Sequence, residues 1–179
     1  MTRVTIAIRH TSALSGPELD AARVLVEAAF DGDFGADDWE HALGGMHVLA
    51  LEGDEIVGHG AVVQRRLLHA GRALRCGYIE AVGVRADRRR RGYGALIMEE
   101  LERIVRGAYD LGALSATGEG LQLYSARGWK VWLGETFALT PAGRVRTADD
   151  DGAVMVLPVA GELDFTGSLT CDWRDGDVW

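Results

Sequence analysis

Long apolar runs are missing from this sequence, and cysteine is scarce in it. No run approaches the roughly 20 apolar residues that a membrane-spanning helix needs. No apolar segment follows residues 1–5 as it would in a secretory leader. Neither a membrane-spanning helix nor a secretory leader is therefore expected. Cys76 and Cys171 are the only cysteines. Two cysteines favour free thiols in a reducing cytoplasm over a disulfide framework, although a single bridge between them remains open.

Several familiar catalytic motifs are also absent. Lys130 is the only lysine, and it does not lie in the Gly-Lys-Ser/Thr sequence of a P-loop. The five histidines form no His-Glu-x-x-His pattern and no cluster with cysteine, so no metal site is expected. No Gly-x-Ser-x-Gly elbow of a hydrolase is present. The net charge of −8 argues against a nucleic acid partner.

What is present describes one globular domain of 179 residues, with 47% hydrophobic and 26% charged residues. Hydrophobic periodicity predicts strands at 4–8, 47–51, 56–68, 74–84, 112–116, 129–139 and 153–159. It predicts helices at 17–30, at about 93–106 and at 119–127, with a helical turn in the loop 31–46. Residues 160–179 read as an irregular tail docked on the domain. The expected architecture is a single α+β domain over residues 1–179 built around a mixed sheet.

The most informative segment joins the strand that ends at Val84 to the next helix. It reads Arg85-Ala86-Asp87-Arg88-Arg89-Arg90-Arg91-Gly92-Tyr93-Gly94. A helix N-terminus offers free N–H groups and the positive end of the helix dipole, and Gly92 and Gly94 let an anion approach the main chain. Together with the arginines, these groups predict a pyrophosphate site, whereas an arginine-rich helix cap on a structural loop is the alternative. The dinucleotide fingerprint is excluded, because Ile97 stands in place of its third glycine.

Arg89-x-x-Gly92-x-Gly94 resembles the signature of the GCN5-related N-acetyltransferases (GNAT), and Leu123-Tyr124-x-x-x-Gly128-Trp129 resembles a second segment of that family. The resemblance implies the GNAT fold, a mixed and mostly antiparallel sheet flanked by helices, with acetyl-coenzyme A as acyl donor. The cofactor-binding residues that it implies are Val82, Gly83, Val84, Arg89, Arg90, Arg91, Gly92, Tyr93 and Gly94. It also implies that Tyr124 donates a proton to the departing thiolate, whereas a core tyrosine bonded to a carbonyl is the alternative.

The acceptor side requires a base, because an ammonium group must lose a proton before its nitrogen can attack. Glu80 is the candidate, since it shares a strand with Val82; a solvated or ion-paired glutamate is the alternative. Acidic residues gather at 31–40 and at 149–179, where eight acids face one base, and they suit a polycationic substrate if they are not simply solvated surface. The terminal Trp179 favours a docked chain end, because tryptophan is costly to expose.

Longer segments resemble the actinobacterial aminoglycoside 2′-N-acetyltransferases over nearly the whole chain, namely 32–34, 37–41, 43–47, 64–66, 74–80 and 171–179. The resemblance implies acetyl transfer to the 2′-amine of gentamicin, tobramycin or kanamycin B by direct attack, with Glu80 as a base through water, in a cytoplasmic homodimer. The substrate-binding residues that it implies are Asp33, Asp38, Glu80, Ala81, Ser115, Asp149, Asp150, Asp177 and Trp179. Ala81 stands where glycine is expected in these relatives.

Two other functions remain open from the sequence. The same fold could acetylate a cell-wall amino sugar or another endogenous amine. A non-catalytic domain that senses acetyl-coenzyme A is the alternative of another class, and Glu80 together with Tyr124 argues against it.

Overall fold

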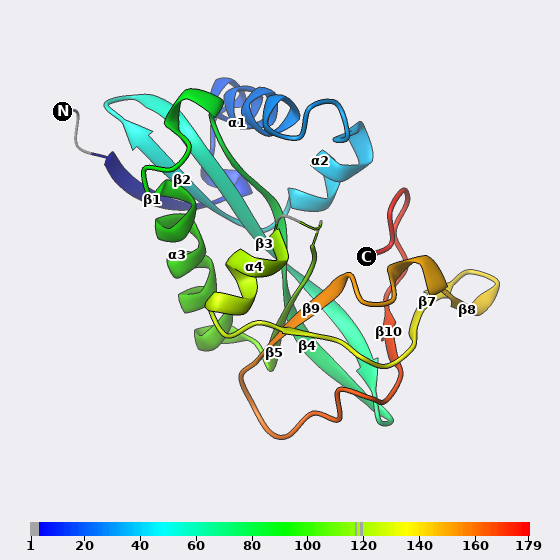
Figure 1. Ribbon diagram of the computed structural model, residues 1–179. Helices are drawn as coiled ribbons and strands as arrows, with labels where there is room; N and C mark the ends of the chain where they lie inside the picture. The colour runs from blue at the N-terminus through cyan, green and yellow to red at the C-terminus, as the bar shows by residue number, and fades with distance from the viewer. Residues whose placement is uncertain (1–3, 117, 119) are drawn as a thin grey trace. The chain divides into compact units, whose positions relative to one another are not determined.

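The computed structural model describes residues 4–116, 118 and 120–179 (Figure 1). The elements are β1 (Val4–His10), α1 (Gly16–Ala29), α2 (Ala36–Ala42), β2 (Met46–Glu52), β3 (Glu55–His69), β4 (Arg72–Val84), α3 (Tyr93–Ala108), β5 (Leu111–Ser115), α4 (Gly120–Ala126), β6 (Lys130–Val131), β7 (Thr136–Thr140), β8 (Gly143–Arg146), β9 (Val154–Pro158) and β10 (Leu169–Cys171). The chain forms two compact units: unit 1 comprises the chain up to Val63 together with Ile79–Ile104, and unit 2 comprises Gln64–Tyr78 together with Val105–Trp179. β3 and β4 contribute residues to both.

Unit 1 begins as an antiparallel meander. β1 pairs with β2, β2 pairs with β3, and β4 is the next neighbour of β3. The helix α1 starts where the sequence predicts it, because Ser15 and Glu18 form a reciprocal capping box and Pro17 stands in the first turn. The Ser15 hydroxyl accepts from the Glu18 N–H, and the Glu18 carboxylate accepts from the Ser15 N–H.

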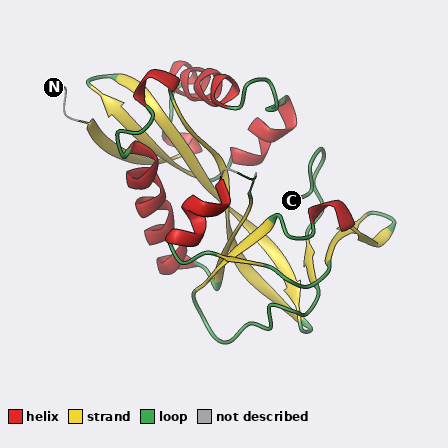
Figure 2. Cartoon of the chain, viewed as in Figure 1, coloured by secondary structure: helices red, strands yellow, loops and turns green. Residues whose placement is uncertain are grey.

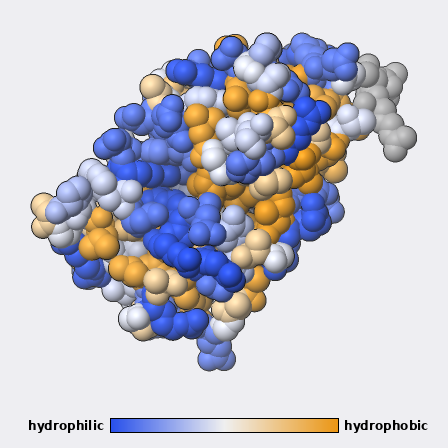
Figure 3. All heavy atoms as spheres, turned by 180° about the vertical axis from the view of Figure 1, so that it is seen from behind, coloured by the Kyte–Doolittle hydropathy of each residue, from blue (hydrophilic) through white to orange (hydrophobic). Residues whose placement is uncertain are grey.

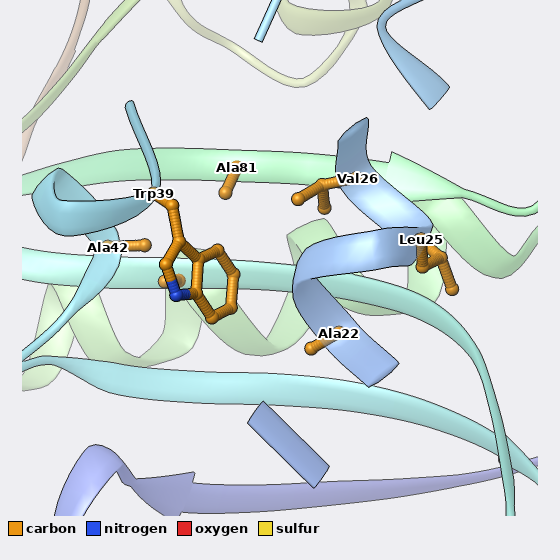
Figure 4. Packing of buried hydrophobic residues seen from close by; sticks show 7 residues of the cluster. Ala22, Leu25, Val26, Trp39, Ala42 and Ala81 are labelled. Carbon is orange, nitrogen blue, oxygen red and sulfur yellow. The ribbon is translucent and has the colours of Figure 1, made fainter. Parts of the chain in front are cut away.

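Helices cover both faces of the unit 1 strands. A Cβ added at Gly83 would lie 3.1 Å from the Cβ of Ala29, so α1 covers that face. A Cβ added at Gly58 or Gly60 would lie 2.8 Å from Ile97, so these glycines let α3 approach the opposite face closely. On the α1 side the buried cluster includes Trp39, whose indole lies over the strands beside Ala81 (Figure 4). The apolar stripe of α3 and the face of α1 are therefore what hold unit 1 together.

Unit 2 contains the remaining strands and α4; Figure 2 colours the strands yellow and the helices red. The strand order is β6-β9-β5-β4-β3-β10-β7-β8. The pairs β4–β5 and β10–β7 are parallel, and the pairs β5–β9, β6–β9, β7–β8 and β3–β10 are antiparallel. The prediction of a mixed, mostly antiparallel sheet flanked by helices is confirmed. Both Cys76 and Cys171 are buried and unbridged in this unit.

Two sequence predictions about unit 2 are wrong. Residues 129–139 do not form one strand: β6 ends at Val131 and β7 begins at Thr136. Between them the N–H groups of Leu133 and Gly134 both donate to the Phe165 carbonyl, and a Cβ on Gly134 would collide with the main chain of Gly167. The tail after residue 160 is also not irregular throughout, because β10 pairs with β3 and β7. The predicted helix 119–127 appears as α4, and residue 119 lies outside the described residues.

Hydrophobic and hydrophilic surface are interspersed over the face shown in Figure 3. No helix in the described part of the chain is both long enough and apolar enough to span a bilayer.

Candidate active site

The N-terminus of α3 in unit 1 carries the predicted pyrophosphate groups. The Leu96 N–H donates to the Gly92 carbonyl at 3.1 Å, which is an i to i−4 bond of the first helical turn. The amides that precede Leu96 in this turn have no carbonyl of their own helix to bond. Arg90 and Gly92 adopt positive φ angles of 60° and 83°, so the main chain curls here instead of running straight into the helix. Alternation of this kind is typical of anion-binding main-chain nests.

The five arginines of this loop are not equivalent. Arg85 pairs with Glu55 and with Asp87, and Arg88 donates to Glu52 at 2.9 Å and to Asp87 at 2.6 Å. The pKa of Asp87 is lowered by the hydrogen bond from Arg85 and by the nearby Arg88 charge. Arg85 and Arg88 therefore neutralise carboxylates of the surrounding strands and turns.

Arg89 is also engaged with the protein itself. Its guanidinium donates to the carbonyl of Ala29 at 3.0 Å and to that of Val84 at 3.3 Å, and its main-chain N–H lies 3.5 Å from the Ala86 carbonyl. The Ala29 carbonyl belongs to the last turn of α1, which attracts a cation. Arg89 thus ties the loop to α1, a role that the signature alone does not reveal.

Arg89, Arg90 and Arg91 are all exposed, and Arg91 also interacts with the Tyr93 hydroxyl. Tyr93 is buried, and its hydroxyl donates to Glu52 at 2.6 Å, which raises the pKa of the tyrosine and lowers that of the carboxyl. Its side chain therefore anchors the helix start, while the main chain at Gly92 and Gly94 stays uncovered by side chains of its own.

Ala81 interrupts the regular course of β4. Its φ is +51°, a left-handed conformation that is uncommon for a residue with a Cβ, and its side chain is buried. Glu80 precedes it and is half-buried, and Val82, Gly83 and Val84 follow it to the end of the strand. The Ala81 methyl, where relatives are expected to have glycine, sits in the α1-side cluster with Trp39.

The acidic candidates of unit 1 differ from each other. Asp33 is exposed in the turn after α1, and its N–H donates to the Phe30 carbonyl at 3.0 Å. Asp38 accepts from the Gly35 N–H at 2.6 Å and so caps the start of α2. One oxygen of Asp38 is therefore used locally, which leaves Asp33 as the more open of the two carboxylates.

A hollow of about 640 Å³ lies in unit 1 between α1 and the β2–β3 turn. Its lining includes Val24, Ala28, Ile56 and Arg85, and it contains none of the predicted site residues. The cation on its wall, Arg85, is already paired with Glu55 and Asp87. The hollow is thus mainly apolar and does not present a free cation to a phosphate.

Tyr124 of unit 2 lies on α4, half-buried, with its ring 6.2 Å from that of Trp129 in an edge-on arrangement. A Cβ on Gly120 would come within 2.9 Å of the tyrosine ring, so the glycine makes room for it. Burial raises the pKa of the Tyr124 hydroxyl. The phenol therefore stays protonated at neutral pH, as a proton donor must.

Asp150 of unit 2 feels the charges of two other predicted carboxylates. Burial raises the pKa of Asp150, and the negative charges of Asp177 and Asp149 raise it further. Asp151 behaves in the opposite way, because Arg146 and Thr136 bind it and lower its pKa to about 2. In this turn Asp151 is neutralised by Arg146, whereas Asp150 lies near other negative charges. A bound cation would relieve the repulsion on Asp150. Ser115, at the end of β5, is exposed.

The chain terminus is docked within unit 2. Trp179 is buried, and its indole Nε1 donates to the Thr147 hydroxyl at 2.9 Å. Earlier in the tail, Arg65 of β3 donates to the Asp172 carboxylate at 2.7 Å and to its carbonyl at 2.9 Å. Arg174 donates to the carbonyl of Asp177 at 2.8 Å. The exposed Asp177 therefore stands on a segment fixed at both ends.

Sequence reasoning missed the residues that hold these groups. Arg65 carried one signal, because it alternates with the buried Leu67 and His69 along β3 and so faces inward. Thr147 carried none. The buried His47 and His59, which form a hydrogen-bonded pair, also went unrecognised because no metal-ligand or catalytic spacing marks them.

Comparisons with known proteins all find acetyltransferases or acyltransferases. Residues 11–132 match the acetyltransferase (GNAT) domain family. An aminoglycoside 2′-N-acetyltransferase of Mycolicibacterium fortuitum is 52% identical over 179 residues, 98% of this chain and 92% of the relative. A GNAT family acetyltransferase of Brucella melitensis, solved in complex with acetyl-CoA, superposes with a TM-score of 0.63 at 18% identity over 96% of this chain and 97% of that chain. An acyl-CoA N-acyltransferase of Pseudomonas aeruginosa gives 0.61 at 16% identity over 87% and 99%. The two structures establish the fold, and the relative from M. fortuitum, at 52% identity, is the comparison that bears on function.

Proposed function

Because the chain belongs to the GNAT family of N-acetyltransferases, we infer that it transfers the acetyl group of acetyl-coenzyme A to the 2′-amino group of aminoglycoside antibiotics. The relative from M. fortuitum carries the name of that activity. The observation that carries the proposal in this chain is the group of carboxylates formed by Asp149, Asp150 and Asp177. Such a group binds a substrate that carries several ammonium charges and repels most cellular anions.

The donor is assigned to unit 1. The amides of Gly92, Tyr93 and Gly94 at the start of α3 would hold the pyrophosphate, with Arg90 and Arg91 as exposed cations. Arg89 supports this site by fixing the loop to α1. The main chain of Val82, Gly83 and Val84 would pair with the amide groups of the pantetheine arm, as an added strand does.

Acid and base roles fall to Glu80 and Tyr124. Glu80 would take a proton from the substrate ammonium, directly or through water, so that the free nitrogen can attack the thioester carbon. Tyr124 would give its proton to the sulfur as the carbon–sulfur bond breaks, and the phenolate would regain a proton from the nitrogen, which ends as a neutral amide. Burial keeps the phenol protonated at neutral pH. The acetyl group passes straight to the nitrogen, without an acyl-enzyme and without a metal ion.

The acceptor contacts are assigned to Asp33, Asp38, Glu80, Ala81, Ser115, Asp149, Asp150, Asp177 and Trp179. Asp150 is the acceptor residue with the clearest physical signature, since burial raises its pKa and the charges of neighbouring carboxylates raise it further. A bound ammonium group would reverse that shift and so gain affinity from the relief of repulsion.

The decisive experiment identifies the product. The protein is incubated with acetyl-coenzyme A and a panel of aminoglycosides, and the products are analysed by mass spectrometry and by NMR for the acetylated position. Kanamycin B, which carries a 2′-amine, is expected to gain one acetyl group at that nitrogen. Kanamycin A, which carries a hydroxyl there, is the matched control and should stay unmodified. Acetylation at another nitrogen, or of both compounds, contradicts the assignment.

Other results of the same assay favour the alternatives. Turnover with amino sugars of the cell wall but not with the antibiotics favours an endogenous acceptor. Tight binding of acetyl-coenzyme A without turnover of any amine favours a sensor. We further propose that the protein acts as a homodimer in the cytoplasm, where buried free thiols such as Cys76 and Cys171 stay reduced; sedimentation equilibrium tests the dimer.

A further inference from the structure

A chain of three hydrogen bonds runs through the interior of unit 1 and ends at the main chain of β4. The Thr11 hydroxyl lies 2.7 Å from Nε2 of His47, Nδ1 of His47 lies 2.9 Å from Nε2 of His59, and Nδ1 of His59 lies 2.8 Å from the Ala81 carbonyl. Neither imidazole has any exposed surface. No part of the proposed chemistry uses these two histidines, yet their chain of hydrogen bonds ends at Ala81, which lies between Glu80 and Val82 in the sequence.

The direction of every bond in the chain follows from its last acceptor. A carbonyl can only accept, so Nδ1 of His59 carries a proton. Burial lowers the pKa of both imidazoles to about 4, so each ring is neutral at pH 7 and carries one proton. Nε2 of His59 must then accept from Nδ1 of His47. Nε2 of His47 is left to accept from the Thr11 hydroxyl at 2.7 Å, a shorter contact than the 3.2 Å from that hydroxyl to the Gly45 carbonyl. Only one arrangement of protons satisfies the chain.

The surroundings keep this arrangement in place. The Trp39 ring packs 5.6 Å from that of His59 and 6.4 Å from that of His47, measured between centroids. Figure 4 shows the indole lying over the strands between Ala42 and Ala81. In such an apolar layer an unpaired ring nitrogen is strongly unfavourable, so the protein gains by keeping every bond of the chain.

The carbonyl that His59 holds belongs to an unusual peptide. Ala81 has a positive φ, which turns its peptide away from the orientation of a regular strand. The Ala81 carbonyl and the Val82 N–H share one planar trans peptide group, so they point in opposite directions. When His59 draws the carbonyl toward β3, the Val82 N–H is aimed away from β3.

We propose that His59, oriented by His47, is a positioning residue for acetyl transfer: it fixes the Ala81–Val82 peptide so that the Val82 N–H donates to the thioester oxygen. The proposal rests on the proposed function. As the amine nitrogen bonds to the carbonyl carbon, the π electrons of the C=O bond move to oxygen, and a fixed N–H donor stabilises that charge. When the carbon–sulfur bond breaks, the electrons return and the thiolate leaves.

The test compares two replacements of His59. His59→Leu removes the donor and keeps the bulk, whereas the amide nitrogen in His59→Asn can occupy the place of Nδ1 and donate to the Ala81 carbonyl. With tobramycin as acceptor, His59→Leu is expected to lower kcat about 100-fold and to leave the KM for tobramycin within about 3-fold. His59→Asn is expected to restore kcat to within about 10-fold of the wild type.

His69→Leu is the matched control. His69 lies on the same strand, is buried, and has Nδ1 3.0 Å from the Ser168 carbonyl, but it belongs to unit 2. Its replacement removes an equivalent bond and should leave kcat within about 2-fold of the wild type. If both Leu variants lose activity equally, or if folded His59→Leu keeps its kcat, the role of His59 is purely structural and the proposal is wrong.

Two measurements keep the proposal separable from the function and from folding. The dissociation constant of coenzyme A divided by that of acetyl-coenzyme A reports the contact with the thioester oxygen, and it should exceed one in the wild type. The ratio should be lower in His59→Asn and closest to one in His59→Leu. If the wild type acetylates no aminoglycoside, the proposed function fails while this ratio still decides the role of His59; an unchanged ratio overturns it. Should His59→Leu not fold, ¹⁵N NMR of the wild type decides, because a His59 protonated at Nε2 contradicts the arrangement.

Discussion

The indole Nε1 of Trp179 donates a hydrogen bond to the hydroxyl of Thr147, 2.9 Å away, and thereby joins the last residue of the chain to the acidic turn that follows β8. The Thr147 hydroxyl in turn donates to that of Thr136 at 2.9 Å. Asp149 and Asp150 follow directly in this turn. The terminal residue and the carboxylates proposed to bind substrate are therefore parts of one fixed arrangement within unit 2.

Deletion of Trp179 is expected to raise the KM for tobramycin about 10-fold, because it removes the hydrogen bond from the indole to Thr147, which fixes one end of the segment that carries Asp177. The affinity for acetyl-coenzyme A, measured by calorimetry, should not change, since the proposed donor groups lie in unit 1. Trp179→Phe keeps an aromatic side chain at this position and loses only the hydrogen bond, so its effect should be about 3-fold. An equal loss of both affinities on deletion means that the terminus serves stability alone.

Asp150 and Asp151 are neighbours with opposite expected behaviour. Asp150→Asn removes a carboxylate that other carboxylates repel, so the KM for tobramycin should rise about 10-fold at low salt while the free energy of unfolding holds or increases. Asp151→Asn breaks the pairing with Arg146 and the bond to Thr136, which costs about 1 kcal/mol of unfolding free energy and leaves KM unchanged. Denaturant titration and steady-state kinetics of the two variants give the comparison, and an exchange of the two phenotypes contradicts the assignment.

Arg89 and Arg90 should also separate binding from stability. Arg90→Ala is expected to weaken binding of acetyl-coenzyme A about 5-fold, an effect that shrinks as salt is added, because Arg90 is exposed at the proposed pyrophosphate site. Arg89→Ala removes bonds to the carbonyls of Ala29 and Val84, so it should lower the melting temperature as well. If Arg90→Ala lowers the melting temperature and Arg89→Ala does not, the assignment of the stabilising role to Arg89 is wrong.

Tyr124→Phe tests the proposed acid. The variant keeps the ring against Trp129 and loses only the hydroxyl, so kcat is expected to fall about 100-fold with little change in either KM. In the wild type the pKa of Tyr124 is raised by burial, so activity should not decline through loss of this proton until the pH exceeds the ordinary tyrosine value of about 10. A kcat within a few-fold of the wild type shows that the thiolate leaves without this acid.

The neutral histidines of unit 1 predict how stability depends on pH. Burial lowers the pKa of His47 and His59 to about 4, from 6.5 in an exposed side chain, and the charge of His10 lowers that of His47 further. Below pH 6.5 the unfolded chain binds protons that the folded chain does not, so stability present above that pH is lost as the pH falls toward 4. The slope should approach about 1.4 kcal/mol per pH unit for each histidine.

Urea titrations between pH 7 and 4 measure this slope. The variant His59→Asn should make it shallower. A wild-type slope with no contribution from His59 means that the pKa of its ring is not lowered in the folded protein.

The sequence predicted most of unit 1 and little of what stabilises unit 2. Capping at Ser15 and the stripe on α3 are local signals, and both elements begin where they were expected. The break after Val131 depends on Gly134 meeting the main chain of Gly167, more than thirty residues away, and no local pattern records such a contact. β10 was missed for the same reason, since three residues show no period and the strand exists through its partners.

The candidate site divides in the same way. Signature positions such as Gly92 and Gly94 were found because backbone freedom at a helix start has a recognisable spacing. The use of Arg89 by α1, the neutralisation of Asp151 by Arg146 and the pairing of His47 with His59 were not, because each depends on which charge or ring nitrogen the fold brings nearby.

The two buried thiols have a practical consequence. Burial raises the pKa of Cys171 to about 11, and its sulfur donates to the Val178 carbonyl, so an alkylating reagent meets neither an accessible atom nor a thiolate in the closed protein. Labelling of Cys171 can proceed only when the surrounding segment of unit 2 opens locally. The Cys171 thiol is thus an intrinsic probe, and the rate of its reaction with a maleimide measures how often the C-terminal tail opens under native conditions.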